Sequence, residues 1–106
     1  MTGYPKNYQL IHTKYPKLMK ALEDAGKAAK KAGPVDVKTG HLIQLAASVA
    51  LRSEGGVHSH VRRALKAGAK EEEIYHTIAL LISTVGFPTA AAAFSWVSDV
   101  IEKKTA

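Results

Sequence analysis

The chain has 106 residues and no cysteine. This absence excludes disulfides, thiolate metal ligands, thiol nucleophiles and Cys-x-x-Cys redox chemistry. It also fits a reducing compartment. The N-terminus, MTGYPKNYQL, has no apolar region typical of a signal peptide, so we expect a cytoplasmic protein. No run approaches the roughly 20 apolar residues of a membrane-spanning helix, and we expect no membrane partner.

Signals for β-strands are also absent. No useful stretch alternates apolar and polar residues, and no Asn-Gly or Asp-Gly pair marks a hairpin. Apolar residues recur instead at helical spacing, as in Ile74, Ile78, Leu81, Ile82 and Val85. The sequence therefore predicts an all-α fold of five to six helices.

Proline and glycine divide these helices. We expect a lead-in segment over residues 1–14 and one helical domain over residues 15–106. Asp36 is a suitable N-cap for a helix that is apolar almost all round and is predicted to be buried. Gly55-Gly56 is predicted to break the chain before a helix over 57–67, and Gly68 to end that helix with a positive φ.

The net charge is +6, and much of it lies between residues 14 and 38. Clustered lysines can bind nucleic acid, or they can form the solvated face of a helix. We favour the second interpretation, without a nucleic-acid partner, because no nucleic-acid-binding motif accompanies them. A basic chain also attracts a small anionic substrate.

The segment 53–69 carries the residues best suited to chemistry. His60 is a candidate for proton transfer at neutral pH, because histidine has an ordinary pKa of about 6.5. The alternative is a partly buried histidine of the core. His58 lies about 200° around the helix from His60, so the two cannot bind one metal ion. We expect no carboxylate to complete a metal site here.

The order of several motifs resembles the carboxymuconolactone decarboxylase family, which shares its fold with alkyl hydroperoxidase D. The matching pieces are KTGHLIQLAASVAL, then HVRRALKAGAKEEEI from His60 to Ile74, then GFPTAAAAF from Gly86 to Phe94. The resemblance covers most of the chain. It implies an all-α, AhpD-like helical bundle assembled into a ring, such as a trimer or hexamer.

The resemblance also separates two branches of the family. Hydroperoxidase members carry Cys-x-x-Cys-x-x-x-His with an upstream Glu, and these positions fall on Ser53, Gly56, His60 and His41. Without sulfur, peroxide reduction by a thiolate is excluded. The decarboxylases instead carry His-x-Arg, which His60 and Arg62 match.

This likeness implies decarboxylation of an anionic lactone or a related small acid, without a cofactor. His60 would be the general acid and His41 its helper. Arg62 is expected to bind a substrate carboxylate, with Arg52 and Arg63 as the alternatives for this role. Glu54 is a further candidate for substrate binding. The alternative is a non-catalytic member of the fold that binds a small acid.

Overall fold

The computed structural model describes residues 5–105, with side chains as far as Lys103. The first four residues of the predicted lead-in, and the C-terminal Ala106, lie outside the described residues. Six helices account for most of the described chain, which contains no strand, so the prediction of an all-α fold with five to six helices is confirmed. No described helix is long and apolar enough to cross a membrane. The chain forms two compact units, residues 1–35 and 36–106.

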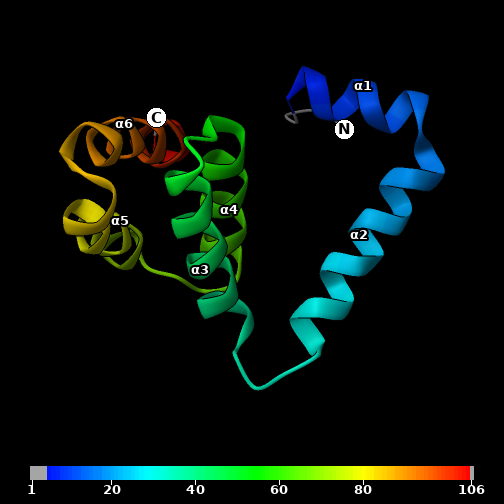
Figure 1. Ribbon diagram of the computed structural model, residues 1–106, viewed down its shortest axis with the longest axis horizontal. Coiled ribbons are helices and arrows are strands. Elements are labelled where there is room, and N and C mark those ends of the chain that lie inside the picture. Colours follow the sequence, from blue (N-terminus) through cyan, green and yellow to red (C-terminus); the bar gives the residue numbers. More distant parts are fainter. Residues whose placement is uncertain (1–4, 106) are drawn as a thin grey trace. The chain divides into compact units, whose positions relative to one another are not determined.

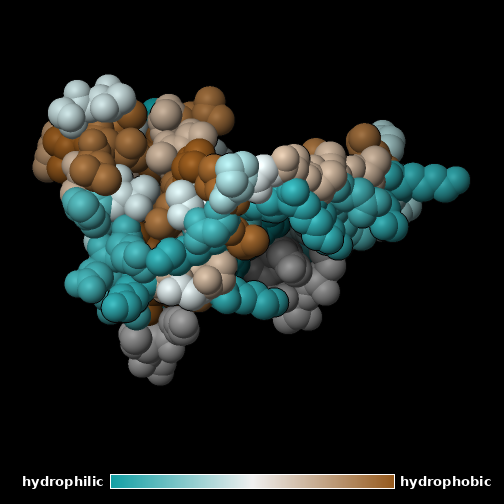
Figure 2. Space-filling model, turned by 90° about the horizontal axis from the view of Figure 1, so that it is seen from below, coloured by the Kyte–Doolittle hydropathy of each residue, from teal (hydrophilic) through white to brown (hydrophobic). Residues whose placement is uncertain are grey.

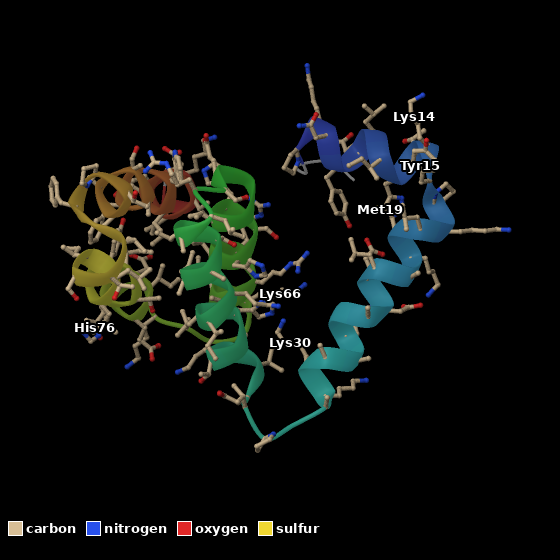
Figure 3. The ribbon with its side chains drawn as sticks, in the orientation of Figure 1. Lys14, Tyr15, Met19, Lys30, Lys66 and His76 are labelled. Atoms are coloured by element: carbon tan, nitrogen blue, oxygen red, sulfur yellow. The ribbon has the colours of Figure 1, made fainter. Side chains whose placement is uncertain are left out.

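The first unit consists of α1 (Lys6–Lys14) and α2 (Pro16–Lys31), joined at Tyr15 (Figure 1). Pro16 opens α2, as predicted, because its fixed φ suits the first helical turn. The Tyr8 hydroxyl donates a hydrogen bond to Glu23 and links the two helices. Met19, labelled on α2 in Figure 3, is the buried residue of this helix. Leu18 and Leu22 of the same helix are 61% and 62% exposed.

The second unit contains α3 (Val37–Ala50), α4 (Glu54–Lys66), α5 (Glu71–Val85) and α6 (Phe87–Thr105). Helices α3 and α4 lie side by side, and α5 and α6 complete the bundle (Figure 1). One continuous core joins all four helices. Its largest fully buried side chains are Leu45, Val49, Val57, Val61, Ile74, Ile78 and Val97.

The break between α3 and α4 does not fall where the glycines predicted it. The helix α4 begins at Glu54, so Gly55 and Gly56 lie in its first turn. The Ser53 Oγ accepts a hydrogen bond from the Gly56 N–H at 3.1 Å and caps the helix. The chain reverses at Arg52, which has a φ of 55°. A serine cap thus outweighed the low helix propensity of two glycines. Gly68 has the positive φ predicted for it, 100°.

The composition of α3 predicted a helix that is buried on all sides, and this prediction is wrong. Its inner face contributes Leu45 and Val49 to the core, but Ile43 is 55% exposed, and Leu51, just after the helix, is 79% exposed. The α5–α6 corner also exposes apolar side chains, at Leu80 and Phe87. Apolar surface, coloured brown, gathers on this part of the second unit in Figure 2. Four helices cannot enclose every apolar face of a bundle this small.

A carboxylate at the start of α5 ties this helix to α3. The Glu73 Oε1 accepts a hydrogen bond from the Lys70 backbone N–H at 2.8 Å. Its Oε2 accepts one from the Lys38 Nζ at 3.0 Å. These bonds, the backbone bond first, hold the pKa of the Glu73 carboxyl below its ordinary value. The glutamate thus compensates for a lysine at the N-cap.

Candidate functional site

His41 and His60 face each other across the α3–α4 pair. Their Nδ1 atoms are 3.4 Å apart, their ring centroids are 5.6 Å apart, and the ring planes are inclined by 37°. His41 is 9% exposed, and His60 is half-buried. The two residues that the family resemblance suggests as general acid and helper therefore lie in contact. The roles assigned to them remain predictions.

The close approach of α3 and α4 places this pair. A Cβ built on Gly56 would lie only 2.7 Å from the Ser48 Oγ, so glycine lets the two backbones come near. Ser48 lies seven residues, about two turns, after His41 on α3, and Gly56 lies four residues before His60 on α4. Because the helices run in opposite directions, the contact of Ser48 with Gly56 brings His41 opposite His60.

The contact between the two Nδ1 atoms restricts which ring nitrogen atoms can carry a proton. A hydrogen bond between two Nδ1 atoms forms only when one of them carries a proton and the other accepts it. The proton can then sit on either ring. Such a pair can give a proton to a substrate from one ring and replace it from the other, which is the requirement for repeated general-acid catalysis.

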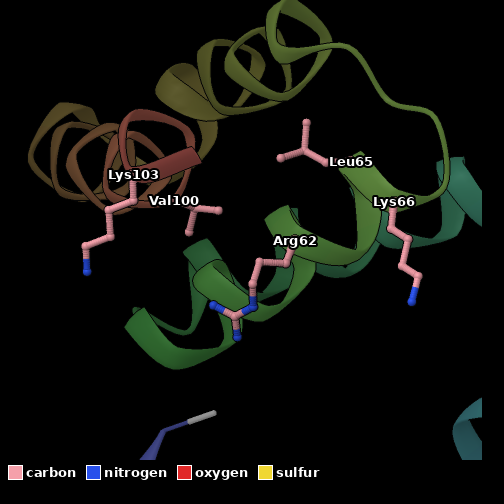
Figure 4. A pocket seen from close by; sticks show the side chains of 5 residues that line it. All are labelled: Arg62, Leu65, Lys66, Val100 and Lys103. Atoms are coloured by element: carbon pink, nitrogen blue, oxygen red, sulfur yellow. The ribbon is translucent and has the colours of Figure 1, made fainter. Parts of the chain in front are cut away.

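Arg62 lies away from the histidines, in an open pocket of about 450 Å³ between α4 and α6. Figure 4 shows Arg62 and Lys66 extending from α4, and Lys103 from α6. Leu65 and Val100 form the apolar part of the lining. Neither His41 nor His60 lines this pocket. His60 is two residues from Arg62 on the same helix, so its side chain points about 200° around the helix from that of Arg62. The structure therefore does not bring Arg62 together with His60.

The other two predicted substrate-binding residues have partners of their own. The Arg52 Nη1 donates a hydrogen bond to the Thr89 Oγ1 at 2.5 Å, which joins the α3–α4 connection to α6. The Glu54 Oε2 lies 3.8 Å from the His58 Nε2. Both side chains are exposed. Their substrate-binding roles remain predictions.

Sequence reasoning missed two cations of the pocket and one acidic residue beside His58. Lys66 lies one turn after Arg62, so the i, i+4 spacing on α4 could have paired them. Lys103 and Asp99 belong to α6, some 40 positions along the chain. No local pattern reports such a contact, because it depends on how α4 and α6 pack.

The model of the carboxymuconolactone decarboxylase family matches residues 16–99. The chain belongs to this family. An uncharacterized protein from Haemophilus influenzae is 34% identical over 59 residues, which are 56% of this chain and 52% of that protein. The chain thus spans about half the length of this curated relative.

Solved structures of the family share the fold. A carboxymuconolactone decarboxylase family protein from Legionella pneumophila, crystallised in its apo form, has a TM-score of 0.77 at 27% identity. The match covers 91% of this chain and 86% of that one. A crystal structure of a Thermotoga maritima protein has a TM-score of 0.71 at 23% identity, over 94% of this chain and 90% of that one. At this identity the second likeness concerns the fold alone.

Proposed function

We propose that this protein catalyses the cofactor-free decarboxylation of a small anionic lactone, such as 4-carboxymuconolactone, or of a related β-keto acid. The observation that carries the proposal is the contact between His41 and His60, 3.4 Å from Nδ1 to Nδ1. The reaction breaks the bond between carbon and the carboxylate. Its electron pair enters the conjugated carbonyl group, carbon dioxide leaves, and a dienolate remains.

His60 then donates a proton to carbon, which removes the negative charge of the dienolate and leaves the lactone ring uncharged. The proton that His60 loses is replaced from solvent through His41, so each turnover consumes one proton and releases one carbon dioxide. The carbonyl group accepts the electrons during bond cleavage, and no electron carrier enters this reaction. General-acid catalysis of this kind contributes about 10²- to 10⁴-fold to a rate.

The test is carbon dioxide release by the purified protein from carboxymuconolactone and a set of β-keto acids. We expect His60→Ala to lower kcat at least about 100-fold, and His41→Ala to lower it less, because His41 acts through His60. His76→Ala is the matched control, since His76 is exposed on α5 (Figure 3). Melting curves establish that the variants fold. Full activity of His60→Ala would refute the proposal, as would a wild type inactive on every acid.

The pocket at Arg62 favours a second function, the binding of a small acid without its conversion. Arg62, Lys66 and Lys103 supply positive charge beside the apolar side chains of Leu65 and Val100. This combination suits an organic anion with an apolar body, because a guanidinium binds a carboxylate through two hydrogen bonds. Calorimetry with aromatic and aliphatic carboxylates tests it. We expect Arg62→Ala to abolish binding, and Arg63→Ala, an exposed neighbour outside the pocket lining, to retain it.

Thiol peroxidase activity is not part of the proposal. One structure of the Thermotoga maritima protein carries a suggested role in antioxidative response, but its likeness to this chain concerns the fold. This chain has Ser53 and Gly56 where hydroperoxidase members would have their cysteines, and a hydroxyl group cannot undergo the oxidation that a thiolate does.

We propose further that the chain acts in the cytoplasm as a homo-oligomer, a trimer or hexamer. The exposed apolar side chains support self-association, since Leu51, Leu80 and Phe87 are 79%, 64% and 68% exposed in the single chain. Light scattering coupled to size-exclusion chromatography measures the mass. A monomer at micromolar concentration would contradict this part of the proposal.

A further inference from the structure

Three side chains with metal-binding atoms meet at the surface of the α4–α6 contact. They are Glu54 and His58 from α4 and Asp99 from α6, and one ligand atom of each lies within 4.8 Å of the other two. The His58 Nε2 is 3.3 Å from the Asp99 Oδ2 and 3.8 Å from the Glu54 Oε2. The expectation from the sequence that no carboxylate would complete a metal site here overlooked the spacing of Glu54, which lies one helical turn before His58.

We propose that Glu54, His58 and Asp99 bind a divalent transition-metal ion of the zinc type. Bonds of about 2.0–2.1 Å from zinc to nitrogen and oxygen, at a tetrahedral angle, place two ligand atoms about 3.4 Å apart. The separation of His58 from Asp99 already has this length. The separation of His58 from Glu54 exceeds it by a few tenths of an ångström, which a rotation of the exposed Glu54 side chain removes.

The ligand chemistry suits zinc and its neighbours rather than calcium or magnesium. An imidazole nitrogen with two carboxylates is a donor set for Zn²⁺, Co²⁺ or Ni²⁺, whereas calcium and magnesium prefer oxygen atoms only. A neutral histidine and two carboxylates carry two negative charges, which a divalent cation neutralises. Three protein ligands leave a fourth position open to water or a small anion.

The two helices hold the ligands in place. Glu54 and His58 are four residues apart, so both lie on one face of α4. His58 follows Val57, and Asp99 lies two residues after Val97; both valines are fully buried in the core that joins α4 to α6. The His58 side chain is 23% exposed and those of Asp99 and Glu54 47% and 57%, so an ion can enter from solvent.

Calorimetric titration of the chelator-treated protein with ZnCl₂ tests the proposal, together with the visible absorption spectrum of the Co²⁺ form. We expect one ion per chain in the wild type. His58→Ala is expected to abolish zinc binding. Glu54→Gln and Asp99→Asn are each expected to lower the affinity for zinc at least about tenfold, because replacing even a residue that only hydrogen-bonds to a metal ligand lowers metal affinity about 10- to 100-fold. These last two substitutions conserve shape, and melting curves of the metal-free variants check their folding.

Three controls separate this site from others. His76→Ala tests binding to any exposed histidine, and His41→Ala and His60→Ala test binding at the histidine pair; all three should bind zinc as the wild type does. Unchanged binding in Asp99→Asn would overturn the proposal. So would loss of binding in His60→Ala, or absence of binding in the wild type. Because this experiment measures metal binding, a negative result would not bear on the decarboxylase proposal, which the release of carbon dioxide tests separately.

Discussion

Replacing Gly56 by alanine should destabilise the protein, although alanine is the better helix former. A Cβ at position 56 would lie 2.7 Å from the Ser48 Oγ, 2.9 Å from the Ser53 Oγ and 3.0 Å from the Ser48 Cβ. Ordinary contacts begin near 3.4 Å, so the closest approach is about 0.7 Å too short. The overlap must be relieved by moving one of the two serines or the helices themselves.

Each way of relieving this overlap breaks or weakens a hydrogen bond. Rotation of the Ser48 hydroxyl gives up its hydrogen bond to the Gln44 carbonyl oxygen, 2.9 Å long, and leaves the Ser48 Cβ in place. Movement of Ser53 weakens the cap of α4. Overpacking of this kind costs about 1–3 kcal/mol, which corresponds to a melting temperature lower by roughly 5–20 °C in a unit of this size.

Gly55→Ala is the matched control, because nothing lies within 4 Å of a Cβ at that position. Both glycines belong to the first turn of α4, so helix propensity favours alanine similarly at each, by up to about 1 kcal/mol. Thermal unfolding followed by circular dichroism should show opposite shifts for the two variants. Adding Ser48→Ala to Gly56→Ala should recover part of the loss. A Gly56→Ala protein as stable as Gly55→Ala would refute the close approach of α3 and α4.

Two further predictions concern stability. Glu73→Gln should lower the melting temperature most at neutral pH: the pKa of Glu73 is lowered in the folded protein, so its contribution is present at neutral pH and lost as the pH falls through the folded-state pKa. Melting curves from neutral pH to about pH 3 should therefore converge in acid, and parallel curves would contradict this reasoning. Ile78→Ala should lower the free energy of unfolding, measured in urea, by about 2–5 kcal/mol, because Ile78 is fully buried. Ile82→Ala, at a 36% exposed position, should cost clearly less, and equal losses would argue against the core described for α5.

The helices themselves were predictable, because helical spacing is a local property. The apolar stripe from Ile74 to Val85 predicted the buried face of α5 correctly at Ile74 and Ile78 but not at Ile82, which is 36% exposed. Pro16 predicted the start of α2. The start of α4 was wrong by three residues. Glycine propensity suggested a break at Gly55-Gly56, whereas the helix begins at Glu54, where the Ser53 Oγ accepts a hydrogen bond from the Gly56 N–H.

The candidate site was predictable only where one helical hairpin forms it. His41 and His60 lie on neighbouring helices, so the family resemblance and a short connection sufficed to bring them together. The pairing of Asp99 with His58 joins positions 41 residues apart, and depends on the register between α4 and α6. The partnership of His60 with Arg62 was inferred from the family's His-x-Arg motif, although two residues along a helix place the side chains on nearly opposite sides.

Only Leu51, Arg52 and Ser53 separate α3 from α4, and this short connection has a consequence for how the family can vary. A residue added to the connection either lengthens the turn or displaces the start of α4 relative to α3. A displacement of that kind would carry His60 away from His41. Sequence changes that keep the two imidazole rings in contact should therefore exchange the three residues more readily than they alter their number. The length of this turn is as much a part of the candidate site as the two imidazole rings.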